Sequence, residues 1–309
     1  MADAENPTSD DREARFGVLI LHAHDLGRAF DELLNRSGNT EPVARDDLPA
    51  ALLFELMHLT RLQFDALCHD LSDAWLSHAA PTHLRPVLEG LGHIAFVLGH
   101  ETDHPVGSAA QRAACLALAR VREEHQAMVS AHPDSVPVGN LHEGPNRIAF
   151  FEDLHARLAC PYPDNVRDWP CKEADGRACS HRETWPCRQT TAAPRRLTTP
   201  TLRRLTHKLS FQFRDLEQAS SLVLHLSLVD RMMVDAGPGT NALVSAPYAM
   251  RASTLAMGLS AYGQALVWVM ETVDARAANI LKAYIASTWK LRDMTEISTG
   301  VWDSAPSAT

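Results

Sequence analysis

The chain has 309 residues, of which 45% are hydrophobic and 22% charged, a composition typical of a globular protein with a sizeable core. Its formal net charge of −9 argues against binding nucleic acid through overall charge, and no DNA partner is expected. Only 6% of the residues are aromatic, whereas Leu and Ala are abundant. This mixture favours helices packed on helices over a sheet, because these side chains lose little entropy in a helix.

The N-terminal half of the chain predicts one part of a helical bundle. Residues 1–12 are polar and predict a disordered tail. They lack the basic start and apolar stretch of a secretory signal, so a cytoplasmic protein is expected. Leu recurs at helical spacing through much of 13–158, between Gly- and Pro-containing breaks. The predicted helices cover about 13–35, 46–71, 82–98, 108–130 and 146–158.

A cysteine-rich insertion, predicted over 159–198, interrupts the helices with five prolines and four cysteines. Such a segment is too poor in apolar residues to form its own core, so it needs a covalent or metal cross-link. Zinc is the favoured staple, because four thiolates, or three and a histidine, satisfy a tetrahedral Zn²⁺. The gaps of ten, seven and seven residues contain no Cys-x-x-Cys pair, so free thiols or disulfides are the alternative. The predicted ligands are Cys160, Cys171, Cys179 and Cys187, and His155 or His181 is a possible replacement for one of them.

A basic region follows within and after the insertion, from Arg182 to Lys208. Between Cys160 and Lys208 there are 10 Lys and Arg residues against 5 Asp and Glu residues. This excess predicts a surface for a protein or RNA partner, with phosphate as one possible target. The alternative is a solvated face that balances acidic neighbours.

Helices resume in the C-terminal part, where 199–297 is predicted to complete the same bundle before a polar tail at 298–309. Helical segments are expected at 201–209, 213–234 and 246–293, with a break at the Gly-Pro-Gly of residues 237–239. Residues 252–270 contain no charged side chain, which suits a buried central helix, or less well a membrane span. No strand alternation persists, so the predicted fold class is all-α, a multi-helix bundle with an irregular cysteine-rich insertion.

Polar residues inside apolar helices supply the candidate catalytic set of Arg85, Glu89 and His225. Arg85, Glu89 and His93 are four residues apart, so they share one face of a helix and the first two can pair. His225 stands within an apolar run. Such groups form either an internal network that fixes how helices meet or a pocket. In a pocket, Glu89 or His225 acts as a general base and Arg85 holds an anion.

The Arg85-x-x-x-Glu89 helix, with Ser220-Ser221-x-x-x-His225 downstream, resembles a broad group of bacterial helical proteins of unknown function, common in actinobacteria. The resemblance covers 75–130 and 205–285. It implies a helical fold and no particular activity, and it leaves the insertion unexplained.

Two sharper enzyme hypotheses rest on single motifs. Glu55-x-x-His58 is typical of an iron ligand pair in ferritin-like bundles, although those sites use two such motifs. Arg120 and His125 have the separation found in helical toxin and defence ribonucleases, but an exposed charged face explains the stretch as well. The chain contains no Gly-rich phosphate loop, Gly-x-Ser-x-Gly elbow or His-Glu-x-x-His motif.

The sequence therefore predicts a helical, zinc-binding protein with a binding or regulatory role, exerted through the basic, cysteine-rich excursion. Whether it is an enzyme stays open. The alternative is an enzyme with a pocket in the bundle, either a metal-dependent oxygenase or a ribonuclease of the defence type.

Overall fold

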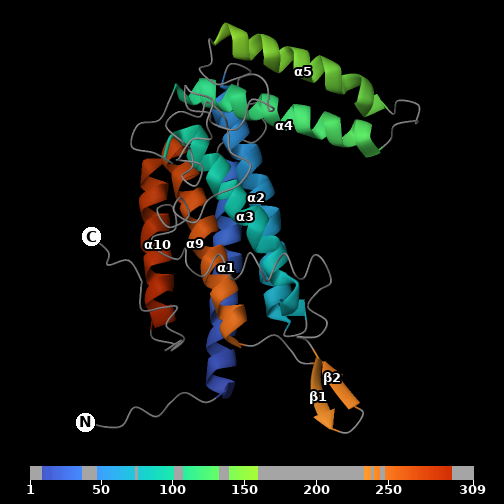
Figure 1. Ribbon diagram of the computed structural model, residues 1–309. Helices are drawn as coiled ribbons and strands as arrows, with labels where there is room; N and C mark the ends of the chain where they lie inside the picture. The colour runs from blue at the N-terminus through green and yellow to red at the C-terminus, as the bar shows by residue number, and fades with distance from the viewer. Residues whose placement is uncertain are drawn as a thin grey trace, which may run out of the picture. The chain divides into compact units, whose positions relative to one another are not determined.

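The computed structural model describes residues 9–36, 47–73, 76–100, 107–131, 139–158, 233–237, 240–243 and 248–293, most of them helical (Figure 1). The predicted all-α character is confirmed over these residues, apart from one short β-hairpin. The helices are α1 (Ser9–Arg36), α2 (Leu48–Ser72), the 3₁₀ turn η1 (Leu76–His78), α3 (Ala80–Leu98), α4 (Ala109–Ala131), α5 (Gly139–Arg157), α9 (Tyr248–Val273) and α10 (Ala275–Asp293). The strands are β1 (Met233–Gly237) and β2 (Thr240–Leu243).

The chain divides into two compact units. Unit 1 comprises residues 1–40, 57–91 and 202–309, and unit 2 comprises residues 41–56 and 92–201. Helices α2 and α3 each contribute residues to both units. The single bundle expected from the sequence stays a prediction, and each unit is described by itself.

Side-chain caps set where several helices begin and end. Asp47 accepts a hydrogen bond from the Ala50 amide at the start of α2, and Asp274 accepts bonds from two amides of α10. At α4, Ser108 and Gln111 exchange side-chain to backbone hydrogen bonds, which is a capping box. Gly99 ends α3 with a φ of 80°, and the following amide bonds back to the Ala95 carbonyl. Each cap satisfies backbone groups that the helix itself leaves unpaired.

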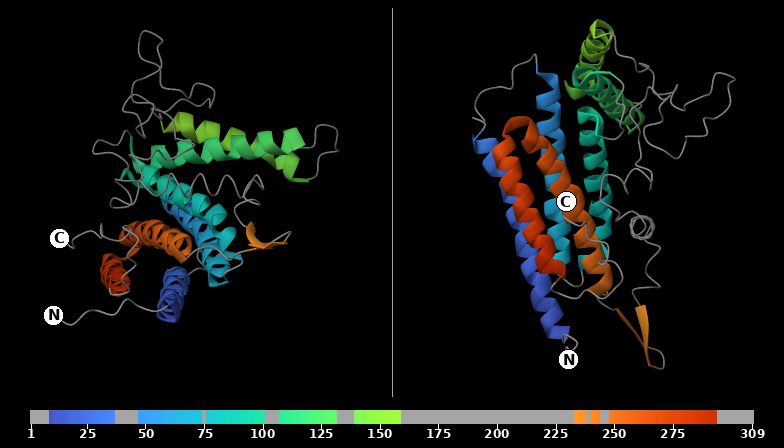
Figure 2. Two further views of the ribbon diagram at one scale, coloured as in Figure 1. Left: turned by 60° about the horizontal axis from the view of Figure 1, so that its bottom comes forward. Right: turned by 90° about the vertical axis from the view of Figure 1, so that its left-hand side faces the viewer.

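In unit 1, α9 packs against both α10 and α1, and α1 also contacts α10, as the views of Figure 2 show. Aromatic rings also contribute to the core of unit 1. The Phe64 ring of α2 stacks on the Tyr262 ring of α9, with centroids 4.3 Å apart and planes 2° from parallel. His22 Nδ1 lies 2.8 Å from the Tyr284 hydroxyl, which joins α1 to α10. The charge-free residues 252–270 thus lie in a largely buried helix, and no helix among the described residues is long and apolar enough to cross a membrane.

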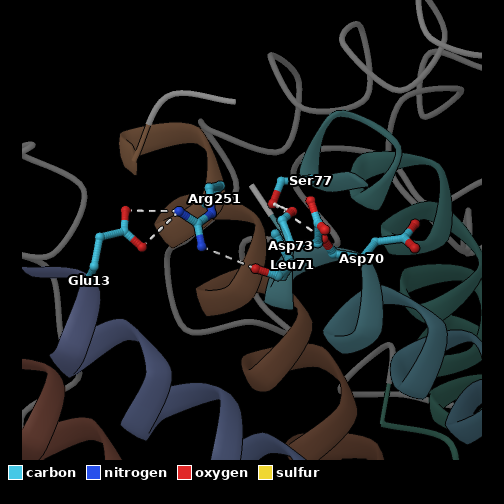
Figure 3. A network of polar contacts seen from close by, with 6 residues as sticks. All are labelled: Glu13, Asp70, Leu71, Asp73, Ser77 and Arg251. Atoms are coloured by element: carbon cyan, nitrogen blue, oxygen red, sulfur yellow. Dashed lines mark hydrogen bonds and ion pairs between the residues drawn. The ribbon is translucent and has the colours of Figure 1, made fainter. Parts of the chain in front are cut away.

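Arg251, which is 5% exposed, ties the start of α9 to two other helices of unit 1 (Figure 3). Its Nη1 donates to both carboxylate oxygens of Glu13, at 2.8 and 2.9 Å. Its Nη2 donates to the Leu71 carbonyl in the last turn of α2, at 3.2 Å. The guanidinium also stacks 4.5 Å from the centre of the Phe16 ring. These contacts compensate the burial of a charge, which would otherwise be costly.

In unit 2, α4 and α5 form a helical hairpin, seen clearly in Figure 1. Arg112, also 5% exposed, connects the start of one helix to the end of another in this unit, as Arg251 does in unit 1. Its Nε donates to the Val97 carbonyl in the last turn of α3, at 3.1 Å, and its Nη1 donates to the Gly107 carbonyl. Gln111 donates to the Leu158 carbonyl at 2.8 Å and so connects the start of α4 to the end of α5.

Two local features differ from the sequence predictions. The break at residues 237–239 is part of an antiparallel hairpin in which Gly237 pairs with Thr240, so residues 233–234 are strand where helix was predicted. These strands are too short for alternation to show in the sequence. The long region predicted over 246–293 is two helices, because Asp274 caps a new helix there.

Helices α2 and α3 come very close together at Gly90 in unit 1. A Cβ added there would lie 2.0 Å from Thr60 Oγ1. We expect Gly90→Ala to lower the free energy of unfolding by about 2–3 kcal/mol, since overpacking a tight contact forces neighbours to move. Urea titration measures the loss. Adding Thr60→Ala should recover part of it, because the hydroxyl and methyl that clash are removed.

Gly17 is the matched control, because a Cβ at this exposed position in α1 meets nothing within 4 Å. Gly17→Ala should stabilise the protein by about 0.5–1 kcal/mol through helix propensity alone. A Gly90→Ala variant as stable as the parent would show that the helices are not this close.

Candidate functional site

A polar cluster that the sequence analysis missed lies between α1 and α2 in unit 1. Arg61 Nη1 donates to Asp31 at 2.8 Å, and Arg61 Nη2 is 3.3 Å from the Asp65 carboxylate. Gly27 lets α1 come close to these groups, because a Cβ there would be 2.9 Å from Asp65 Oδ1. The Arg61 side chain is 18% exposed, so the ion pairs are shielded from water on one side.

Burial governs the protonation of the groups around this cluster. Desolvation raises the pKa of Asp65 in spite of the nearby charge of Arg61, which acts to lower it. Burial also raises the pKa of Tyr262, a fully buried residue of α9. The thiol of Cys68 is buried as well, and both burial and the charge of Asp65 raise its pKa far above the ordinary value. At neutral pH the phenol and the thiol therefore stay protonated, which suits a structural network and not a nucleophile.

The predicted catalytic pair is formed. Arg85 Nε donates to Glu89 Oε1 at 3.0 Å, as expected for residues four apart in α3. The two side chains are 33% and 37% exposed, so the pair lies at the surface of unit 1 and not within its core. His225, the third member of the set, lies outside the described residues, so the geometry of the complete set stays a prediction.

Three residues from separate sequence motifs meet in unit 2. Glu55 of α2 forms an ion pair with Arg120 of α4, with 3.4 Å between Oε1 and Nη1. His93 of α3 is electrostatically coupled to the same arginine. Burial, and then the positive charge of Arg120, lower the pKa of His93 to about 4. At neutral pH this cluster therefore combines an arginine, a neutral imidazole and a carboxylate.

Within the described residues, the structure adds no second motif to either of the two single-motif enzyme hypotheses. Glu55 and His58 are both exposed on α2, and the carboxylate is already paired with Arg120. Within the residues that the structure describes, no three His, Cys, Asp or Glu side chains are grouped so as to hold a metal ion. On the ribonuclease stretch, Glu124 pairs with Arg147 at 3.5 Å, and Arg122 pairs with Glu152. These pairs match the alternative reading, a charged helix face.

The predicted zinc ligands Cys160, Cys171, Cys179 and Cys187 lie outside the described residues, as do His181 and the basic region from Arg182 to Lys208. Of the predicted ligands, His155 is described by the structure, and it lies in the last turn of α5. It is 8% exposed, and its Nε2 has no hydrogen-bond partner among the described residues. Both cysteines that the structure describes, Cys68 and Cys115, are buried.

The missed polar residues left only weak signals in the sequence. Arg61 and Asp65 are four apart in a helix, the same signal that identified Arg85 and Glu89. Arg251 directly precedes the charge-free stretch. Their partners Asp31 and Glu13 are far away in the sequence, so the pairing itself could not be foreseen.

Comparisons of the chain with known protein families, with curated proteins and with solved structures found no match.

His93, a half-buried residue of α3, makes a prediction about pH. His93 has a pKa of about 4 in the folded protein and about 6.5 when unfolded, so the unfolded state binds the extra proton between these values. Stability contributed by neutral His93 is complete above pH 6.5 and is lost as pH falls towards 4. By linkage this loss amounts to at most about 3 kcal/mol.

Urea unfolding of the parent and of His93→Gln at pH 7.5 and pH 4 measures this pH-dependent loss of stability. The parent should lose more stability than the variant over this interval. His58→Gln, which changes an exposed histidine of α2, is the control and should behave like the parent. Equal losses in the parent and His93→Gln would contradict a buried, neutral imidazole.

Proposed function

We propose that this chain is a binding protein. A helical frame carries the excursion, which is the cysteine-rich insertion together with the basic region that ends at Lys208. Zinc cross-links the excursion, and the excursion captures an anionic partner, RNA in the first place. The observation that carries the proposal is the clustering of four cysteines within 28 residues, next to the basic region. Zinc bound by these thiolates would supply the folding energy that the excursion cannot obtain from a hydrophobic core.

The burial of the remaining cysteines supports this assignment. Of the six cysteines, Cys68 and Cys115 are buried in helices of the two units. The raised pKa of Cys68 disfavours the thiolate that a metal requires. The thiols outside these two helical positions are the four of the excursion.

His155 supports a ligand set that reaches back into α5. Its buried Nε2 lacks a hydrogen-bond partner among the described residues, and it stands five positions before Cys160. Neutral imidazole is a common zinc ligand, and buried polar nitrogens need a partner. Three cysteines with His155 are therefore an alternative to four cysteines.

The charge distribution favours RNA over an acidic protein. Residues 160–208 hold 10 basic and 5 acidic residues in a chain of net charge −9, and they include Trp169 and Trp185. Single-stranded nucleic acid is bound by positive side chains on the phosphates and aromatic rings on the bases.

The zinc staple makes a prediction for the purified protein. Elemental analysis without added metal or chelator should find about one zinc per chain, and Cys171→Ser or Cys187→Ser should lose it. Cys68→Ala removes a buried thiol of unit 1 and should keep the zinc. His155→Gln decides the ligand set, because it lowers the zinc content only where His155 is a ligand.

Absence of zinc from the parent protein would contradict the proposed zinc site. Iron or manganese that survives in the cysteine variants would instead favour a metal-dependent oxygenase through Glu55 and His58.

The partner makes a separate prediction. Replacing Arg203 and Arg204 by Gln should weaken the binding of single-stranded RNA and flatten its salt dependence by about 0.7 per lost phosphate contact. Fluorescence anisotropy at several salt concentrations measures both. The charge-matched control replaces Arg28 and Arg157, exposed arginines on α1 and α5, and should bind like the parent. If polyglutamate binds and RNA does not, the partner is an acidic protein and the RNA assignment is wrong.

An enzyme is the second candidate, favoured by the surface position of the Arg85–Glu89 pair. A carboxylate that is 37% exposed can reach a ligand, and a positive neighbour can hold an anion beside it. In this case Glu89→Gln or His225→Ala abolishes turnover of the folded protein, whereas Cys171→Ser does not. For a binding protein, Cys171→Ser abolishes partner capture, whereas Glu89→Gln leaves it intact.

A further inference from the structure

Helix α1 has a second stripe of side chains on the face opposite to its buried one. Its core residues Phe16, Ala23 and Phe30 recur every seven residues on the side that packs within unit 1. On the opposite side, half a turn away, Val18 is 47% exposed and Leu21 is 65% exposed. These two apolar side chains therefore belong to an outward face of α1, which is amphipathic in the reverse sense to an ordinary surface helix.

The outward stripe has the spacing of a helix that packs against another helix. Ala14, Val18, Leu21, Asp25 and Arg28 are separated by four, three, four and three residues, as are the a and d positions of a coiled coil. In the structure Ala14 and Arg28 are exposed as well, and Asp25 is half-buried and ion-paired with Arg28. The stripe thus has an apolar centre and a charged end.

The order of residues along this stripe is complementary to itself when a second copy runs in the opposite direction. A two-fold axis midway between Val18 and Leu21 sets each of these residues opposite the other in the second copy. The same register sets Arg28 opposite position 11, which is an aspartate. Opposite charges at both ends of a helix pair favour this orientation. A parallel pair would instead set Arg28 opposite its own counterpart, and like charges disfavour that arrangement.

We propose that the outward stripe of α1, from position 11 to Arg28, is an interface between two copies of this chain, which pair in antiparallel orientation. Such a contact is two-fold symmetric and closes at two copies. Because one helix face buries little surface, the dimer is weak and forms only as the protein concentration rises. The inference rests on neither zinc nor RNA, so it can fail without the proposed function failing.

Sedimentation equilibrium of the full chain from about 1 μM to about 1 mM tests the pairing. The parent should show a monomer–dimer equilibrium. Leu21→Glu should raise the dissociation constant at least about tenfold, because it places two charges at the apolar centre of the interface. The matched control is Leu62→Glu, which changes an exposed leucine of α2 and should leave the dissociation constant as in the parent.

A charge exchange tests the register and the orientation. Arg28→Asp and Asp11→Arg should each raise the dissociation constant about fivefold, because each sets like charges opposite one another twice in the dimer. The two changes combined should restore the affinity of the parent. The proposal is overturned if the parent stays monomeric over the whole range, if Leu21→Glu dimerises as the parent does, or if the combined variant dimerises no better than the single ones.

Discussion

The constraint on which both helical units depend is that a buried guanidinium must find acceptors. Arg251 and Arg112 meet it in the same way, each standing near the start of one helix and donating to a carbonyl in the last turn of another. Those carbonyls lack partners within their own helices, so one contact satisfies a cation and a helix end together. The position of α9 against α2, and of α4 against α3, follows from these contacts. Apolar packing then fills the space between.

The same constraint separates structural from functional polar groups. Arg61 is held by two aspartates, and the neighbouring phenol of Tyr262 and thiol of Cys68 stay protonated, so that cluster is closed to chemistry. Arg120 forms an ion pair with the exposed Glu55, and its Nη1 makes no hydrogen bond within the described residues. The guanidinium groups of Arg61, Arg112 and Arg251 donate to acceptors on other helices and so connect helices within each unit. Binding is assigned to the basic, cysteine-rich excursion.

Local structure could be predicted from the sequence more fully than contacts could. Leu periodicity located most helices within a few residues, and the spacing of Arg85 and Glu89 predicted their pairing, because both depend only on helical geometry. The boundary between α9 and α10 was not predicted, because the capping role of Asp274 depends on the chain reversing there. The partnership of Arg251 with Glu13, and of Arg120 with Glu55 and His93, joins residues far apart in the sequence and depends on how the helices pack. For Cys160, Cys171, Cys179, Cys187 and His225, the predictions stand as the sequence made them.

The most direct test of this account compares Arg112→Met, Arg251→Met and Arg120→Met by urea unfolding at neutral pH. Methionine keeps much of the apolar stem, so the differences report on the guanidinium. The first two variants should each lose about 2–4 kcal/mol, because they leave helix-end carbonyls or a glutamate without their donor. Arg120→Met should stay within about 1 kcal/mol of the parent, since only an exposed ion pair is lost. An Arg120→Met variant destabilised as strongly as the other two would contradict the account, because Arg120 would then support the frame itself.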